Sequence, residues 1–246
     1  MPSVKINNLE TYYEIFGMGS ECLILHGGSE NIGTMYHLAN RLVEKNYKVF
    51  LPERRGHGRS EDTSDEFSYE QFASDTYQFI KTFKLDGCFA VGYSDGAIIL
   101  LLLAIKYPKL FKKIALLGGQ YHYDGLEPYF IKALKSDNVL KLFEKERIEY
   151  ERINKYRISF EKFLNKIILL WLTSPKIDYS DLEKITTPTL IISADRDLIK
   201  LEHTISMFKG IKSSHLAIIP DANHNFPISR PNFTANLILN FFNTKP

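Results

Sequence analysis

The chain has 246 residues, of which 44% are hydrophobic and 24% are charged, a composition that suits one sizeable globular domain or a domain with an insertion. Its formal net charge is +2 and no block of basic residues stands out, which argues against a nucleic-acid-binding or polybasic membrane-binding surface. Residues 1–8 lack the apolar stretch of a signal peptide and no run reaches the length of a membrane span, so we expect a cytoplasmic location.

The predicted elements begin with an antiparallel hairpin, in which the strand-like residues 4–6 and 12–16 flank the turn signal Asn7-Asn8. Further strands are expected at residues 22–25, 48–51, 88–91, 113–117, 189–193 and 216–219. Helices are expected at residues 35–45, 68–83, 97–105, 201–209 and 232–242, with Ser68 as the N-cap of the second. Cys22 and Cys88 each open one of these strands, and we interpret both as core residues, not as a disulfide pair.

The central strands are continuously apolar and alternate with helices along the chain. This pattern predicts an α/β fold with a mostly parallel eight-stranded sheet and helices on both faces. In such sheets, functional sites form at the carboxyl ends of the strands. Four loops are therefore expected to converge on one edge of the sheet, those after Leu25, Val91, Ser193 and Pro220.

Residues 120–186 interrupt this alternation, because they are helical and charged and strand signals return only after Thr187-Pro188. We interpret them as a helical cap of about three helices, inserted into a core made of residues 1–119 and 187–246. The cap contains aromatic residues that are candidates for lining a pocket over the site: Tyr121, Tyr123, Tyr129, Phe130, Tyr150, Tyr156, Phe160 and Trp171. The alternative for each ring is packing within the cap or against another subunit.

The pentapeptide Gly92-Tyr93-Ser94-Asp95-Gly96 lies between a predicted strand and a predicted helix. A strand that turns sharply into a helix at G-x-S-x-G is the nucleophile elbow. The turn strains the backbone of the serine, and glycines two residues before and after it allow neighbouring backbone to approach. The helix that starts there directs free N–H groups toward an oxyanion forming beside Ser94. The alternative is a serine in a glycine-rich turn without chemistry.

A serine hydroxyl needs a base to accept its proton, usually an imidazole that a carboxylate orients. Of the seven histidines, His224 follows the last predicted strand, and a parallel sheet brings that loop to the edge where Ser94 lies. The carboxylate should follow an earlier strand, and the end of the strand at 189–193 is followed by both Asp195 and Asp197.

With these residues in place, the chain resembles the α/β-hydrolase family over nearly its whole length. The matching segments are Leu25-His26-Gly27-Gly28, residues 51–60, Gly92-Tyr93-Ser94-Asp95-Gly96, residues 188–197 and residues 220–224. The family's chain order of nucleophile, acid and histidine is reproduced by Ser94, Asp197 and His224. In this family the acid usually lies three residues after a small residue, and Ala194 at that position selects Asp197 over Asp195. The alternative acid position holds Gly118-Gly119-Gln120, which offers no carboxylate.

The resemblance implies an oxyanion hole built from the backbone N–H groups of Gly28 and Asp95, each typically worth about 10²–10³-fold in rate. Asp95 departs from the family's pattern, because an uncharged residue is common at this position. Its carboxylate is favourable at a helix start but would repel an oxyanion, so we expect the side chain to point away. Tyr93 and His122 are the candidates for further substrate contacts.

The remaining histidines suit structural roles, His26 and His57 within their loops and His37, His203 and His215 near element ends. The sequence has no Cys/His cluster, paired-carboxylate motif or phosphate-binding loop, so we expect no metal and no cofactor.

These residues predict a serine hydrolase that cleaves an ester or related acyl bond of a small molecule through an acyl-enzyme intermediate. The serine argues against dehalogenase and epoxide-hydrolase relatives, which use an aspartate nucleophile, whereas thioesterase, amidase and carbon–carbon bond hydrolase activities stay open. The aminopeptidase branch is matched only at His26-Gly27-Gly28. The alternatives from other classes are a receptor-like member with little turnover and an interaction protein whose charged cap helices bind a partner. We expect a small-molecule acyl substrate, no nucleic-acid or membrane partner, and a monomer or homodimer.

Overall fold

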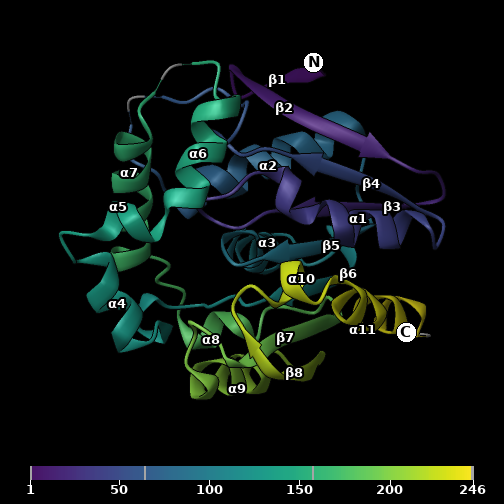
Figure 1. Ribbon diagram of the computed structural model, residues 1–246. Helices are drawn as coiled ribbons and strands as arrows, with labels where there is room; N and C mark the ends of the chain where they lie inside the picture. Colours follow the sequence, from purple (N-terminus) through teal and green to yellow (C-terminus); the bar gives the residue numbers. More distant parts are fainter. Residues whose placement is uncertain (1, 64, 157, 245–246) are drawn as a thin grey trace.

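An eight-stranded sheet runs through the centre of the protein, in the strand order β1-β2-β4-β3-β5-β6-β7-β8 (Figure 1). The computed structural model describes residues 2–63, 65–156 and 158–244. The pairs β1–β2 and β2–β4 are antiparallel, and the remaining pairs are parallel. The strands are β1 (Ser3–Ile6), β2 (Leu9–Phe16), β3 (Ser20–Leu25), β4 (Tyr47–Pro52), β5 (Cys88–Tyr93), β6 (Phe111–Leu117), β7 (Thr189–Arg196) and β8 (Ser214–Asn223). The predicted α/β fold with a mostly parallel eight-stranded sheet is confirmed.

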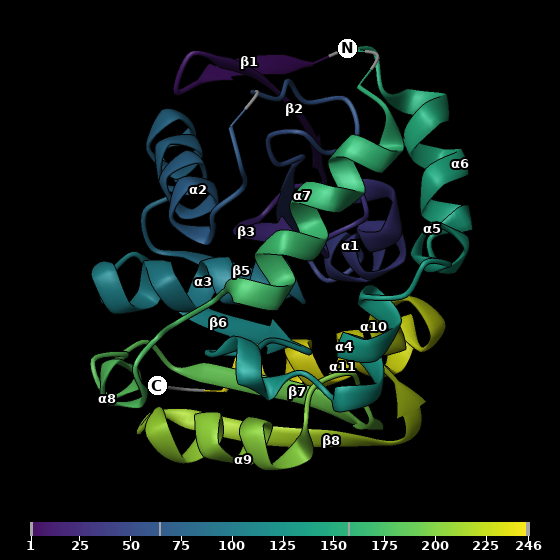
Figure 2. The ribbon, with the colours of Figure 1, turned by 90° about the vertical axis from the view of Figure 1, so that its left-hand side faces the viewer.

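Helices cover both faces of the sheet, as predicted (Figures 1 and 2). The central strands are apolar on both sides, so that Leu23 and Leu25 of β3 enter one buried core and Cys22 and Ile24 enter the other. α1 and α11 close the second core, whereas α2, α3 and α9 close the first. These helices are α1 (Tyr36–Val43), α2 (Tyr69–Phe83), α3 (Asp95–Lys106), α9 (Leu201–Gly210) and α11 (Pro231–Asn243).

Local sequence signals explain where several elements begin and end. Asn7 and Asn8 both adopt positive φ in the two-residue turn between β1 and β2, a conformation that asparagine tolerates well. The Ser68 hydroxyl accepts a hydrogen bond from the N–H of Gln71 and so caps α2, as predicted. At the other edge of the sheet, β7 and β8 run further than predicted, and an unpredicted short helix, α10 (Phe226–Ser229), follows β8.

Residues 120–186, which we call the cap segment, lie between β6 and β7, and Figure 1 places most of its helices at one end of the sheet. The segment holds a 3₁₀ turn, η2 (Tyr123–Gly125), and the helices α4 (Pro128–Leu134), α5 (Val139–Leu142), α6 (Glu144–Ile153), α7 (Phe160–Thr173) and α8 (Tyr179–Leu182). These are more helices than the three expected, because turns divide the charged stretch into short pieces. The division into core and cap stays a prediction.

Among the described residues, no helix combines the length and the apolar character needed to cross a membrane.

Candidate active site

Ser94 occupies a strained turn between β5 and α3. Its backbone has φ 53° and ψ −115°, a conformation that residues other than glycine rarely adopt. The two flanking glycines are required by close backbone contacts, because a Cβ on Gly92 would lie 2.4 Å from the carbonyl oxygen of Gly96, and a Cβ on Gly96 would lie 2.5 Å from that of Leu25. The strand–turn–helix geometry expected for G-x-S-x-G is therefore present.

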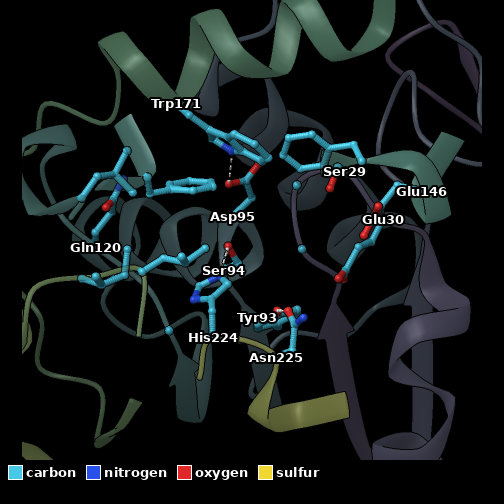
Figure 3. A pocket seen from close by; sticks show the side chains of 18 of the residues that line it. Ser29, Glu30, Tyr93, Ser94, Asp95, Gln120, Glu146, Trp171, His224 and Asn225 are labelled. Atoms are coloured by element: carbon cyan, nitrogen blue, oxygen red, sulfur yellow. Dashed lines mark hydrogen bonds between the residues drawn. The ribbon is translucent and has the colours of Figure 1, made fainter. Parts of the chain in front are cut away.

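The structure brings Ser94, His224 and Asp197 together, and Figure 3 shows the contact between Ser94 and His224. His224 Nε2 lies 3.0 Å from the Ser94 hydroxyl, and His224 Nδ1 lies 2.6 Å from Asp197 Oδ1. Gly118 lies beneath the imidazole, where a Cβ would come within 3.0 Å of His224 Cε1. The arrangement places a base beside the hydroxyl and a carboxylate behind the base.

Asp197 is held by donors that sequence reasoning overlooked. Its Oδ2 accepts hydrogen bonds from the Ser193 hydroxyl at 2.9 Å and from the Ala194 N–H at 3.3 Å. Asp195 lies elsewhere, because its carboxylate accepts from the N–H groups of Asp221 and Ala222 at 2.8 and 3.0 Å. Asp195 therefore fixes the loop that leads to His224, whereas Asp197 contacts the imidazole itself.

Burial is the largest single influence on the pKa values of His224 and Asp197, but the surrounding charges and hydrogen bonds together exceed it. Burial disfavours the ionised carboxylate, yet His224 and the hydrogen bonds to Asp197 bring its pKa below the ordinary value. Burial likewise disfavours the imidazolium, yet the Asp197 charge and hydrogen bond raise the pKa of His224. The pair is thus stabilised in the charged form that follows proton uptake from Ser94.

A cavity of about 300 Å³ opens beside Ser94. Its apolar wall is formed by Ile98, Leu126, Phe130, Leu142, Phe143, Trp171, Leu198 and Ile199. Three of the predicted cap aromatics line it, namely Tyr129, Phe130 and Trp171. The others pack elsewhere: Tyr150 and Phe160 on Phe163, Tyr121 on His203, Tyr123 on His122 and Tyr156 beneath the Lys155 ammonium. Structural packing therefore accounts for most of that set.

The Asp95 side chain turns toward the loop that holds Gly28, although we expected it to point away from a forming oxyanion. Its Oδ1 accepts a hydrogen bond from the Tyr69 hydroxyl at 2.8 Å and another from Trp171 Nε1 at 2.9 Å, the latter shown in Figure 3. Its Oδ2 lies beside Gly28, where a Cβ on that glycine would come within 2.7 Å of it. The direction of the carboxylate is thus set by donors on α2 and α7, and neither donor is recognisable from the sequence around Asp95.

The two predicted substrate contacts differ in placement. Tyr93 lines the cavity, and its hydroxyl donates to Asn225 Oδ1 at 3.2 Å. His122 is absent from the cavity wall, because it caps η2 by accepting from the Asp124 N–H. The described cavity wall therefore gives no support to the expected contact between His122 and a substrate, which stays a prediction.

Three polar residues that no motif marked also line the cavity: Glu30, Gln120 and Glu146. Figure 3 shows the two glutamates on one side and Gln120 on the other. Burial raises the pKa of Glu30 to about 7, partly offset by a hydrogen bond from Thr34. No group of three His, Cys, Asp or Glu residues suited to a metal ion occurs in the described ranges.

Comparison with known proteins places these features in a family. The sequence model of the family described as "Serine aminopeptidase, S33" matches residues 19–168. This match is much longer than the three residues His26-Gly27-Gly28 at which the aminopeptidase branch was expected to resemble the chain.

Individual relatives cover nearly the whole chain. A putative non-heme chloroperoxidase of Synechocystis sp. is 26% identical, over 98% of this chain and 99% of that protein. The human serine hydrolase BPHL is 25% identical, over 90% of this chain and 79% of that protein. Among solved structures, a bromoperoxidase from Bacillus anthracis has a TM-score of 0.84 at 22% identity, over 99% of both chains. A meta-cleavage product hydrolase from Pseudomonas fluorescens IP01 has a TM-score of 0.82 at 18% identity, over 99% of this chain and 97% of that one. At these levels of identity, the similarity to the two solved structures shows the fold alone.

Proposed function

The chain belongs to the serine aminopeptidase, S33 family within the α/β-hydrolase superfamily of enzymes, and from this membership we propose that it is a serine hydrolase that cleaves an ester or related acyl bond of a small molecule. The observation that carries the proposal is the continuous contact from Asp197 through His224 to Ser94, at the wall of a cavity large enough for a small substrate.

In the proposed reaction, Ser94 Oγ attacks the acyl carbon while its proton passes to His224 Nε2. Asp197 orients the imidazole and stabilises its charged form. The N–H groups of Gly28 and Asp95 are proposed to bind the oxyanion. The proton then moves from His224 to the leaving alcohol, an acyl-enzyme forms, and a water molecule activated by His224 releases the acid and frees Ser94.

Intact-protein mass after exposure to a fluorophosphonate probe tests this proposal. Ser94 Oγ would displace fluoride from phosphorus, so wild type should gain one adduct and Ser94→Ala none. The matched control is Ser29→Ala, because Ser29 also lines the cavity but lies outside the elbow, and it should label like wild type. An adduct that persists on Ser94→Ala would refute the assignment of the nucleophile.

The charges of the cavity narrow the substrate class. Its acidic side chains are Glu30, Asp95 and Glu146, whereas no lysine or arginine is among the lining residues in the described part of the chain. Two of the residues that line the cavity each have a buried acceptor oxygen, Asp95 Oδ2 and Gln120 Oε1, with no donor among the described residues. Because an unpaired buried acceptor is costly, a substrate that supplies hydrogen-bond donors and positive charge gains most there. We therefore propose a substrate with an ammonium group close to its scissile carbonyl.

Alanine ethyl ester and N-acetylalanine ethyl ester form a pair of probes for this preference, since acetylation removes the positive charge and two of the three N–H donors and adds one small neutral acetyl group. Wild type should have a kcat/KM about 10–100-fold higher for the unacetylated ester, which carries the ammonium group, than for the N-acetyl ester. This ratio is the scale of one hydrogen bond to a charged group. Asp95→Asn should abolish most of that ratio and leave hydrolysis of the N-acetyl ester nearly unchanged. A ratio near one in wild type would contradict the cationic substrate class without touching the serine hydrolase proposal.

The receptor-like alternative makes a different prediction for the same protein. A member of this kind would label at Ser94 and bind esters, yet release acid only once or very slowly. Measuring acid release over many equivalents of ester separates the two, because sustained turnover fits only the hydrolase.

A further inference from the structure

The loop that holds Gly28 is bound from behind by one buried arginine. Arg54 follows β4 and is only 5% exposed. Its two terminal nitrogens donate to consecutive carbonyl oxygens, that of His26 at 2.5 Å and that of Gly27 at 2.5 Å. His57 Nε2 contacts the next carbonyl oxygen, that of Gly28. We call residues 26–28 the oxyanion loop. Their three successive carbonyl groups are therefore bonded to residues that follow β4.

This arrangement fixes the direction of an N–H group. The Gly27–Gly28 peptide bond is not among the cis bonds of the described residues, and in a trans peptide the C=O and the following N–H point in opposite directions. Because the Gly27 carbonyl is turned toward Arg54, the Gly28 N–H is turned away from Arg54, on the side where Gly28 and Ser94 line the cavity. Among the described residues, this N–H donates to no other group.

Among the described residues, Arg54 does not form an ion pair of the kind that usually accompanies a buried arginine. In the described part of the chain, no carboxylate lies within ion-pair distance of its guanidinium, and its Nε has no partner. Burial lowers the pKa of Arg54, and the negative charge of Asp95 opposes that shift. Apart from a contact with the Phe72 ring, the guanidinium binds only residues 26–27 and His57 among the described residues. The cost of burying its charge is therefore offset mainly by the bonds to the oxyanion loop.

We propose that Arg54 is a positioning residue, which orients the Gly28 N–H toward the oxyanion that forms on the substrate of Ser94. The proposal rests on the proposed function, because it gives the Gly28 N–H a role only if acyl transfer at Ser94 passes through an oxyanion. The fork of a guanidinium is what allows one side chain to hold two adjacent carbonyl groups at once. A lysine would supply the charge without that geometry.

The time course of fluorophosphonate labelling separates positioning from mere structural support. The endpoint counts assembled sites, whereas the rate constant depends on stabilisation of the negatively charged phosphonyl oxygen. Arg54→Met should reach the wild-type endpoint of one adduct per chain with a rate constant about 10²-fold lower, the scale for one oxyanion donor. The matched control is Arg55→Met, since Arg55 pairs with Asp75 on α2 and its side chain does not touch the oxyanion loop. This control should label at the wild-type rate.

Other outcomes overturn the inference. A reduced endpoint with an unchanged rate constant would mean that Arg54 supports folding only, and an unchanged endpoint and rate would mean that it is dispensable. If Arg54→Met does not fold, Arg54→Lys decides the matter. Its labelling should be slower than that of wild type, with a full endpoint, if simultaneous bonding to two carbonyl groups is required. Its labelling rate should match wild type if the positive charge alone is required. Absence of labelling on folded wild type would instead overturn the proposed function, and the positioning role with it.

Discussion

At the scale of single residues, the two carboxylates after β7 have separable roles. Asp197→Asn should lower kcat by about 10⁴-fold, because the amide cannot hold His224 in the orientation and tautomer that accept the proton of Ser94. Asp195→Asn should leave kcat close to wild type, since in the described part of the chain its carboxylate hydrogen-bonds to the N–H groups of Asp221 and Ala222 and not to His224. Steady-state kinetics on an activated acyl ester measures both. A larger loss of kcat in Asp195→Asn than in Asp197→Asn would reverse the assignment.

The dependence of activity on pH belongs to the same scale. His224 must be neutral to accept a proton, and its pKa is raised by Asp197 against the effect of burial, with a further contribution from Glu30. The acid limb of kcat/KM should therefore have its midpoint above the ordinary value of about 6.5. Because the pKa of Glu30 is about 7, this side chain is only partly ionised over the acid limb, so Glu30→Gln should move the midpoint modestly to lower pH. Glu151→Gln is the control, because Glu151 is exposed on α6 and pairs with Arg147. Midpoints that coincide in wild type and Glu30→Gln would argue against this coupling.

At the scale of secondary-structure elements, the C-terminal helix is fastened by one buried lysine. Lys113 of β6 donates to the carbonyl oxygens of Phe241 and Thr244 at 2.8 and 2.6 Å and to the Thr244 hydroxyl at 2.7 Å. These carbonyl groups lie at the C-terminal end of α11, where the regular bonding within a helix stops, and that of Phe241 also accepts from the Thr244 N–H and hydroxyl. Lys113→Met keeps the length of the side chain but removes the donors, so it should lower the free energy of unfolding by about 2–4 kcal/mol. Urea titration measures the loss, and a change below about 0.5 kcal/mol, the scale of an ordinary surface substitution, would contradict this role.

How far the sequence predicts an element depends on whether its signal is local. The order and type of the strands, the N-cap at Ser68 and the turn at Asn7-Asn8 follow from apolar runs and from side chains that bond to nearby backbone, and the structure agrees. The proximity of Ser94, His224 and Asp197 could also be predicted, because parallel strands bring their carboxyl ends to one edge.

Contacts between distant segments were not predictable in this way. The direction of Asp95 is set by Tyr69 and Trp171, which come from α2 and α7, and no pattern near the elbow identifies them. The number of cap helices depends on where short charged segments turn, and such segments carry a weak periodic signal. His122 lies near the site in sequence order, yet its bond within η2 keeps it out of the cavity wall.

At the scale of the whole molecule, the interior holds histidines that make folding sensitive to acid. Burial and the nearby Arg54 charge lower the pKa values of both His26 and His57 well below the ordinary value, and burial lowers the pKa of His203 to about 4. Below about pH 6.5 the unfolded chain binds protons at these positions and the folded protein does not. These groups therefore cause no loss of stability above about pH 6.5. As the pH is lowered from there toward their folded pKa values, the free energy of unfolding falls.

The substitution His203→Gln isolates one of these groups. Glutamine does not titrate, yet its amide oxygen can accept the hydrogen bond that the Tyr121 N–H gives to His203 Nε2 at 3.2 Å. Between pH 7 and pH 4.5 the free energy of unfolding should therefore fall less steeply in His203→Gln than in wild type, by a difference of order 1–2 kcal/mol after allowance for partial exposure. Urea unfolding at several pH values measures the two slopes. Because Asp197, His26 and His57 titrate equally in both proteins, equal slopes would show that His203 is protonated in the folded state and that the acid sensitivity resides in the loops behind the oxyanion hole.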